Sequence, residues 1–243
     1  MSPKHNLSAA MGVTMRRGMR SLCLCLMPAA LLALSAASNP DILRDRLIAD
    51  ARAVPAAGLY FDRSTDMVRK GGGTVSNVSM VERWDGKSWT LISKNGKAPT
   101  VSQKRDAERV AGAAPVPGYH RLAVLLATAT SASQDAQGRT VLQIPVLPAN
   151  SVRTDTGDIS SHLKAEAVIG SRDGKPFVEQ VHVTARETFK LNSLITVKTF
   201  DMVSNYKLDA NGRPRLASQS ADSVGSVFGF TGGEKSQVTF TYR

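Results

Sequence analysis

The chain has 243 residues, of which 42% are hydrophobic and 21% are charged, and 31 Lys and Arg against 20 Asp and Glu give a formal net charge of +11. These proportions are those of a globular protein, so they exclude a wholly disordered or collagen-like chain. The length suits one domain or two small ones.

Residues 1–37 have the pattern of an export signal. A basic stretch ending at Arg20 precedes an apolar run, Leu22 to Leu34, which is followed by small residues. The run is shorter than the roughly 20 residues of a spanning helix. We therefore predict a signal peptide cleaved after Ala37 and a periplasmic or secreted protein. A retained anchor and, from Arg16-Arg17, the twin-arginine export route are the alternatives.

Both cysteines, Cys23 and Cys25, lie in that apolar run. Leucine precedes each of them where a lipid-anchor site has a small residue, so we do not expect lipidation. Cleavage removes both thiols, and with them any disulfide or Cys-based zinc site. It also removes four basic residues, so 27 basic and 20 acidic residues leave a charge of +7. This charge favours anionic partners such as membrane headgroups, whereas no motif supports nucleic acid.

The exported part begins with a helix signal. Asn39 suits the cap, Pro40 the first turn, and Asp41 the positive end of the helix dipole. Apolar residues then recur at helical spacing until Pro55 ends the run. We predict a helix over 40–54.

A hairpin with two tryptophans is predicted next, because the apolar period changes to two on either side of Asp85-Gly86. A turn centred on that dipeptide places Glu82 opposite Trp89. A loop longer by two residues places Trp84 opposite Trp89 instead. Both registers leave the two tryptophans on one face.

The remaining elements are helical first and then extended. Residues 100–111 predict a polar helix, 118–127 a short helix with a wide apolar face, and 128–139 a loop. Six strands follow, at 140–146, 162–169, 177–189, 194–208, 216–230 and 237–242. Long strands joined by sequential hairpins predict one antiparallel sheet in a single domain over 39–243.

The predicted hairpin around Asp173-Gly174 has a testable register. Apolar residues occupy odd positions in both strands, so pairing the apolar faces requires an even sum of paired residue numbers. A three-residue loop that includes Arg172 meets this requirement, with Gly174 in the left-handed conformation. It would bring His162 diagonal to His182, the best metal candidate. Lys164 would lie opposite His182 and oppose a cation, so we predict no metal site.

Familiar catalytic and phosphate-binding motifs are missing from the sequence. Gly71-Gly72-Gly73 lacks the lysine and helix of a phosphate loop, so it is interpreted as a connection. Glu179 and Glu187 share the apolar face of a predicted strand, which fits a raised-pKa acid less well than a sheet end or cavity edge. We expect no cofactor, and an enzyme is the least favoured class.

Apolar side chains on both faces of the predicted strand 194–208 suggest a covered sheet: Leu194, Phe200 and Met202 point one way, and Ile195, Val197 and Val203 the other. A flat sheet with so few helices would leave apolar surface exposed. We therefore predict an α+β fold with one large curved antiparallel sheet, a half-barrel, and two or three short helices on its concave face. An apolar hollow between them is the predicted ligand site, with candidate residues Met80, Trp84, Trp89, Leu91, Leu122 and Leu125.

Four segments, VERWDGKSWTLISKNGKAPT at 81–100, PGYHRLAVLL at 117–126, PFVEQVHV at 176–183 and NGRP at 211–214, resemble a family of uncharacterised secreted proteobacterial proteins. That resemblance implies export and fold but no activity. The expected architecture also resembles the half-barrel of periplasmic lipoprotein carriers, whose concave side holds acyl chains. The order of helices and strands differs from those carriers, so no residue role is transferred.

Two functional hypotheses follow. The first is a non-enzymatic periplasmic carrier or binder of lipid or another apolar ligand. The alternative is an envelope interaction module that binds anionic membrane surfaces through its basic face, with the hollow filled by side chains.

Overall fold

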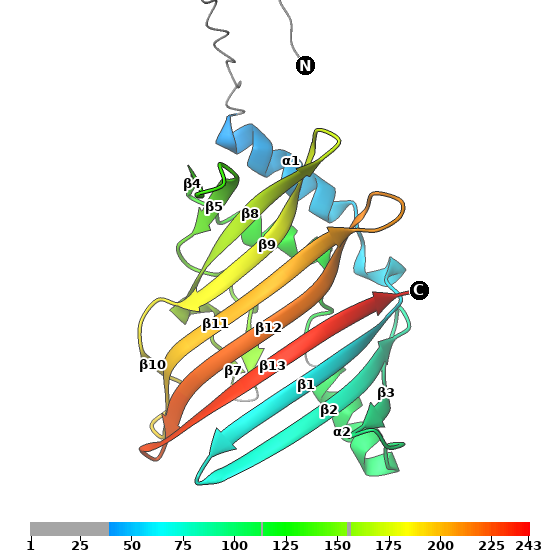
Figure 1. Cartoon of the computed structure of the whole chain (residues 1–243), viewed down its shortest axis with the longest axis vertical. Coiled ribbons are helices and arrows are strands. Elements are labelled where there is room, and N and C mark those ends of the chain that lie inside the picture. The colour runs from blue at the N-terminus through cyan, green and yellow to red at the C-terminus, as the bar shows by residue number, and fades with distance from the viewer. Residues whose placement is uncertain (1–38, 113, 155–156) are drawn as a thin grey trace, which may run out of the picture. The chain divides into compact units, whose positions relative to one another are not determined.

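The computed structural model describes residues 39–112, 114–154 and 157–243 (Figure 1). Every described helix and strand belongs to one compact unit, residues 37–243. The predicted signal peptide and its cleavage site lie outside the described residues. Within the described ranges, no helix is long and apolar enough to cross a membrane.

Most of the described chain is antiparallel β-sheet, accompanied by three short α-helices: α1 (Pro40–Arg52), α2 (Val101–Gly112) and α3 (Leu122–Leu126). The early strands are β1 (Phe61–Gly71), β2 (Thr74–Trp84), β3 (Trp89–Lys94), β4 (Ser131–Gln134), β5 (Thr140–Ile144), β6 (Arg153–Thr154) and β7 (Gly157–Asp158). The later strands are β8 (Leu163–Arg172), β9 (Lys175–Ala185), β10 (Phe189–Lys190), β11 (Ile195–Leu208), β12 (Pro214–Val227) and β13 (Phe230–Tyr242).

One sheet contains all of these strands except β6 and β7, which pair with each other. Its order is β3-β2-β1-β13-β12-β11-β9-β8-β5-β4, and β10 adds to β11. Strands β3 and β4 form its two edges, so the sheet is open. The C-terminal strand β13 lies beside β1, so the first and the last strand of the sheet are neighbours in its interior (Figure 1).

Helix α1 forms for the local reasons that its sequence suggests. The Asn39 side chain accepts a hydrogen bond from the Asp41 N–H at 3.0 Å, and Pro40 occupies the first turn. Leu43, Leu47, Ile48 and Ala51 are buried on one side. They share a core with the buried side chains of α3 and with those of one face of the sheet.

The tryptophan hairpin adopts the longer of its two possible loops. Trp84 faces Trp89, and the ring centroids are 5.5 Å apart. The Asp85 carboxylate closes the loop by accepting hydrogen bonds from the backbone N–H groups of Lys87 and Ser88.

Four strands were not predicted: β1 and β4 of the large sheet, and the two-residue strands β6 and β7. Strand β1 places Phe61 on the core side, but Arg63, Thr65 and Arg69 share that face, so its sequence lacks apolar alternation. Strand β4 is a polar four-residue edge strand within the predicted loop 128–139. Both are paired strands because of their neighbours rather than their own composition.

The predicted three-residue loop between β8 and β9 is wrong. The loop has two residues, Asp173 and Gly174, both with positive φ, and Arg172 faces Lys175. A β-bulge at Glu179 supplies the extra residue, because Val168 pairs with Gln180 while Ile169 pairs with Val178. Beyond the bulge the paired numbers have an even sum. The apolar faces therefore meet as expected, through a bulge instead of a longer turn.

The expectation that strand 194–208 is apolar on both faces also fails. A bulge at Lys198 shifts the register of β11, so Val197 faces Gly225 and Phe200 faces Ser223 on the same side of β12. The opposite face of the sheet is polar and carries ion pairs such as Arg83–Asp62 and Lys235–Asp222. Large apolar side chains are thus gathered mainly on one face.

A buried hydrogen bond joins the bulged part of β9 to the short 3-10 helix Tyr119–Arg121. The Tyr119 hydroxyl accepts a hydrogen bond from the Val178 N–H at 3.0 Å, and both residues are buried. We expect Tyr119→Phe to lower the free energy of unfolding by about 1–3 kcal/mol, because it leaves a buried N–H without an acceptor. Urea unfolding would measure this. The exposed Tyr60→Phe is the control, and equal losses in both variants would contradict the prediction.

Stability should also fall at alkaline pH. Burial raises the pKa of Tyr119 and of Tyr242 to about 12, and burial raises the pKa of Tyr206 as well. A phenol whose pKa is higher in the folded chain stabilises fully below its unfolded pKa of about 10, and this contribution is lost as pH rises toward the folded pKa. Urea unfolding from pH 8 to 11 should show a decline above pH 10 that is shallower in Tyr119→Phe. A slope unaffected by that substitution would disprove the assignment.

Candidate functional site

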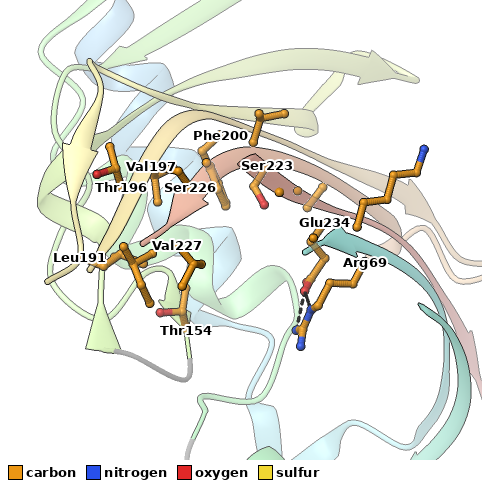
Figure 2. Close-up of a pocket in the computed structure, with 18 of the residues that line it drawn as sticks. Arg69, Thr154, Leu191, Thr196, Val197, Phe200, Ser223, Ser226, Val227 and Glu234 are labelled. Carbon is orange, nitrogen blue, oxygen red and sulfur yellow. Dashed lines mark hydrogen bonds and ion pairs between the residues drawn. The ribbon is translucent and has the colours of Figure 1, made fainter. Parts of the chain in front are cut away.

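A pocket of about 890 Å³ lies at the end of the sheet where β1 turns into β2 and β12 turns into β13. Its lining comes from these strands, from β11 and from the segment around β6 (Figure 2). In Figure 2 the side chains of Leu191 and Val227 lie on one side and those of Arg69 and Glu234 on the other. The pocket is therefore assembled from segments that are distant in sequence.

Small residues on the two central strands leave this space open. Ala221, Ser223 and Gly225 occupy alternate positions of β12, and Gly232 and Ser236 belong to β13. They lie side by side, because Gly225 faces Gly232 and Ala221 faces Ser236. At the other end of the same face, buried large side chains such as Phe61, Phe240 and Leu163 fill the core.

Close backbone packing explains two of those glycines. A Cβ on Gly225 would lie 2.3 Å from the Thr196 carbonyl oxygen, and one on Gly232 would lie 2.7 Å from that of Lys70. Both distances are too short for a real side chain. The strands thus require glycine here, and the missing side chains contribute to the volume of the pocket.

The walls around the small residues are largely apolar. Figure 2 shows Phe200 and Val197 on the strand beside Ser223 and Ser226. The other apolar lining residues are Met67, Val152, Ile159, Leu191, Ile195, Val224, Val227, Phe228 and Phe230. A pocket of this composition suits a hydrocarbon or aromatic group.

Charge in the pocket lining is mostly positive. Arg69, Lys70 and Arg153 line it, and Glu234 is its only acidic residue among those described. Both Nε and Nη2 of Arg69 donate to one carboxylate oxygen of Glu234, at 2.9 and 2.6 Å. Because that pair neutralises itself, the excess charge at this end of the sheet comes from Arg153 and from Lys70, both of which are exposed.

None of the six residues proposed from the sequence lines this pocket. Trp89, Leu91 and Leu122 are buried, Trp84 and Leu125 are half-buried against the core, and Met80 lies on β2 opposite Lys94. Both tryptophans are near Phe61, at the end of β1 opposite to the pocket. The sequence signal for the pocket is the alternation of the small residues Ala221, Ser223 and Gly225, together with Gly232-Gly233, whereas the ligand-site prediction rested on large apolar residues.

The sequence candidates for chemistry are separated by the observed register. Glu166 faces His182, whose Nε2 lies 2.7 Å from an Asp201 carboxylate oxygen on the polar face. His162 instead stacks on the ring of Phe189 with centroids 4.3 Å apart. The proposed diagonal histidine pair does not form. Within the described ranges, no cluster of three or more His, Cys, Asp or Glu side chains is arranged to hold a metal ion.

The two glutamates expected on an apolar face are also elsewhere. Glu179 is the bulged residue of β9, and its carboxylate lies 3.3 Å from the Arg139 guanidinium. Glu187 follows β9 and is exposed. Neither carboxyl group lines the pocket.

Comparisons of the chain with protein-family models, with curated proteins and with solved structures found no match. The candidate function is therefore argued from the geometry of the pocket and its surroundings. The resemblances noted for the sequence remain predictions.

Two ion pairs of the same geometry allow burial to be tested directly. Arg63 donates through Nε and Nη2 to one Glu82 oxygen, at 3.0 and 2.6 Å, as Arg69 does to Glu234. The side chains of Arg63 and Glu82 are 23% and 7% exposed, whereas those of Arg69 and Glu234 are 62% and 34% exposed. The Arg63 guanidinium also lies 4.2 Å from the centroid of the Trp89 ring.

We expect Arg63→Met to lower the free energy of unfolding by about 3 kcal/mol, because it leaves a buried carboxylate without its partner. The matched change Arg69→Met should cost less than about 1 kcal/mol, since water screens that pair. Urea unfolding at pH 7 measures both. A similar loss in the two variants would show that burial does not distinguish the pairs.

Proposed function

We propose that this protein is a non-enzymatic carrier or binder that holds a lipid acyl chain or another apolar ligand in the pocket. The observation that carries the proposal is an open pocket of about 890 Å³ with apolar walls and with small residues on β12 and β13. Its volume lies within the roughly 300–1,000 Å³ typical of sites for small molecules. The excess of positive charge in the lining favours a ligand with an anionic end.

We also propose that the sheet is a half-barrel with α1 and α3 on its concave side. Bulges at Glu179 and Lys198 support curvature, because a bulge bends its strand and increases the local twist. Support for the helix placement comes from the core that α1 and α3 share with the apolar face of the sheet. In this arrangement the helices cover one end of the face and the pocket lies at the other.

The proposed site of action is the periplasm or the cell exterior. The basic stretch and apolar run of residues 1–37 support export, and both cysteines precede residue 38. A chain free of cysteine after cleavage suits an oxidising compartment.

An interaction module without a ligand site is the less favoured alternative. That alternative needs side chains to fill the hollow, whereas Ser223, Gly225 and Gly232 leave it open. The charge of +7 after cleavage supports attraction to anionic surfaces, but it does not account for the apolar walls.

A pocket-filling substitution tests the proposed function. Ser223→Phe should lower the affinity for the fluorescent apolar probe 1-N-phenylnaphthylamine about tenfold or more, because the new ring occupies the space between Phe200 and Glu234. Ser220→Phe is the matched control: it changes the same residue type on the same strand, on the polar face. Fluorescence titration of both variants measures the effect.

Mass spectrometry of solvent extracts complements the titration. The purified protein should release an apolar compound that is depleted in Ser223→Phe and retained in Ser220→Phe. If the wild type binds no probe and releases no such compound, the pocket is not a ligand site. Equal binding by the two variants would place the ligand elsewhere.

A further inference from the structure

The turn between β12 and β13 exposes large apolar side chains to solvent. Phe228 is 68% exposed and Phe230 is 71% exposed, and Val227 and Leu194 are also exposed. The Phe228 N–H donates to the Leu194 carbonyl oxygen at 2.9 Å, so the loop before β11 lies against the turn. We call these four residues the apolar tip. The turn is the orange-to-red hairpin at the lower left of Figure 1.

Backbone conformation makes Phe228 unusual. Four two-residue turns of the described chain have positive φ at both positions: Gly72-Gly73, Asn95-Gly96, Asp173-Gly174 and Phe228-Gly229. Glycine, asparagine and aspartate are the residues that such turns favour. The first three turns follow this rule, and only the fourth places a bulky aromatic residue, at φ 50°, in the left-handed region.

Phe228 therefore carries two costs, an unfavourable backbone conformation and an exposed aromatic ring. Neither the turn nor the core gains from it. Residues that break a local rule in this way are a reason to look for a function outside the fold. The sequence does not predict this turn, because phenylalanine is not a residue that such turns favour. Residues 216–230 are therefore predicted as one strand that includes Phe228.

Basic residues belong to the same pocket lining as three of the four residues of the apolar tip. Val227, Phe228 and Phe230 line the pocket together with Arg69, Lys70 and Arg153, and Glu234 is neutralised by Arg69. Lys70 and Arg153 are exposed. Basic residues next to exposed aromatic residues are the combination that binds an anionic membrane interface.

We propose that the apolar tip inserts into the surface of an anionic lipid bilayer, with Lys70 and Arg153 contacting the headgroups. A bilayer fits better than a protein partner, because a narrow hairpin tip of four residues offers much less than the roughly 800 Å² per partner of a stable protein interface. Docking in this way turns the mouth of the pocket toward the lipid. The proposal does not require that the pocket hold a ligand.

Vesicle sedimentation tests the tip directly. We would use residues 38–243, which contain the whole described core, because the apolar run 22–34 would bind vesicles by itself. This protein should partition into phosphatidylglycerol vesicles at 0.1 M salt and bind phosphatidylcholine vesicles at least about fivefold less. The double variant Phe228→Asn, Phe230→Ser should lower the partition coefficient about tenfold or more, since it removes two apolar anchors.

Two further variants separate insertion from unfolding. Phe228→Asn alone should unfold at a higher urea concentration than the wild type, because asparagine suits the left-handed turn, and yet bind vesicles less tightly. Ile42→Ser on α1 is the matched control, since Ile42 is also 68% exposed. It should leave the partition coefficient unchanged. Lys70→Gln with Arg153→Gln should weaken binding to phosphatidylglycerol vesicles alone.

Several outcomes would overturn the proposal. They are unchanged partition of the double tip variant, an equal loss in Ile42→Ser, or equal binding to neutral and anionic vesicles. A wild type that forms dimers without vesicles, and that Phe228→Asn converts to monomers, would identify a second copy of the chain as the occupant of the tip. Binding of the fluorescent probe in the pocket is measured in a separate experiment. The vesicle results therefore neither support nor contradict the proposed ligand site.

Discussion

Strand alternation is the constraint on which this structure depends. A strand presents successive side chains to opposite faces, so long strands such as the 14-residue β11 keep their apolar side chains together only where the sequence period holds. Where the alternation of apolar residues changes phase, the strand contains a β-bulge, as at Glu179, at Lys198 and at Ala217. Each bulge returns the following apolar residues to the same face. The result is a sheet with one face directed to the core and one polar face.

Along that single face, side-chain size decides what is filled and what is hollow. Phe61, Tyr242 and Phe240 pack edge to face or tilted at one end, beside the buried side chains of α1 and α3. At the other end the same strands carry glycine, alanine and serine, and two of the glycines are required by close strand contacts. The core and the pocket are therefore parts of one surface, and a change of side-chain volume separates them.

Three properties coincide at the hollow end of the sheet: an apolar pocket, an excess of positive charge and the exposed apolar tip. Each alone has an ordinary explanation. Together they describe a surface suited to an amphipathic molecule and to the interface where such molecules are found. Under the proposed function, docking and ligand exchange would take place at the same end, and the core at the other end would hold the sheet rigid.

Sequence patterns were informative where structure depends on near neighbours. The Asn39-Pro40-Asp41 start of α1 and the turn at Asp85 rest on contacts within a few residues. The tryptophan pairing was limited to two registers, one of which occurs. The candidate site was not predictable in this way, because Trp84 and Trp89 are as suitable for a core as for a ligand platform, and pairing with Phe61 places them in the core end.

By itself, then, the sequence determined the helix signals, the antiparallel strand-rich class and the charge of the chain. Tertiary structure alone decided that β1 lies between β2 and β13, that bulges set the registers of β9 and β11, and that Phe228-Gly229 is a turn. The physical reason is that register and burial are set by partners distant in the chain, here β1 with β13 and β9 with β11. A pocket formed by the absence of large side chains becomes visible only when those partners are in place.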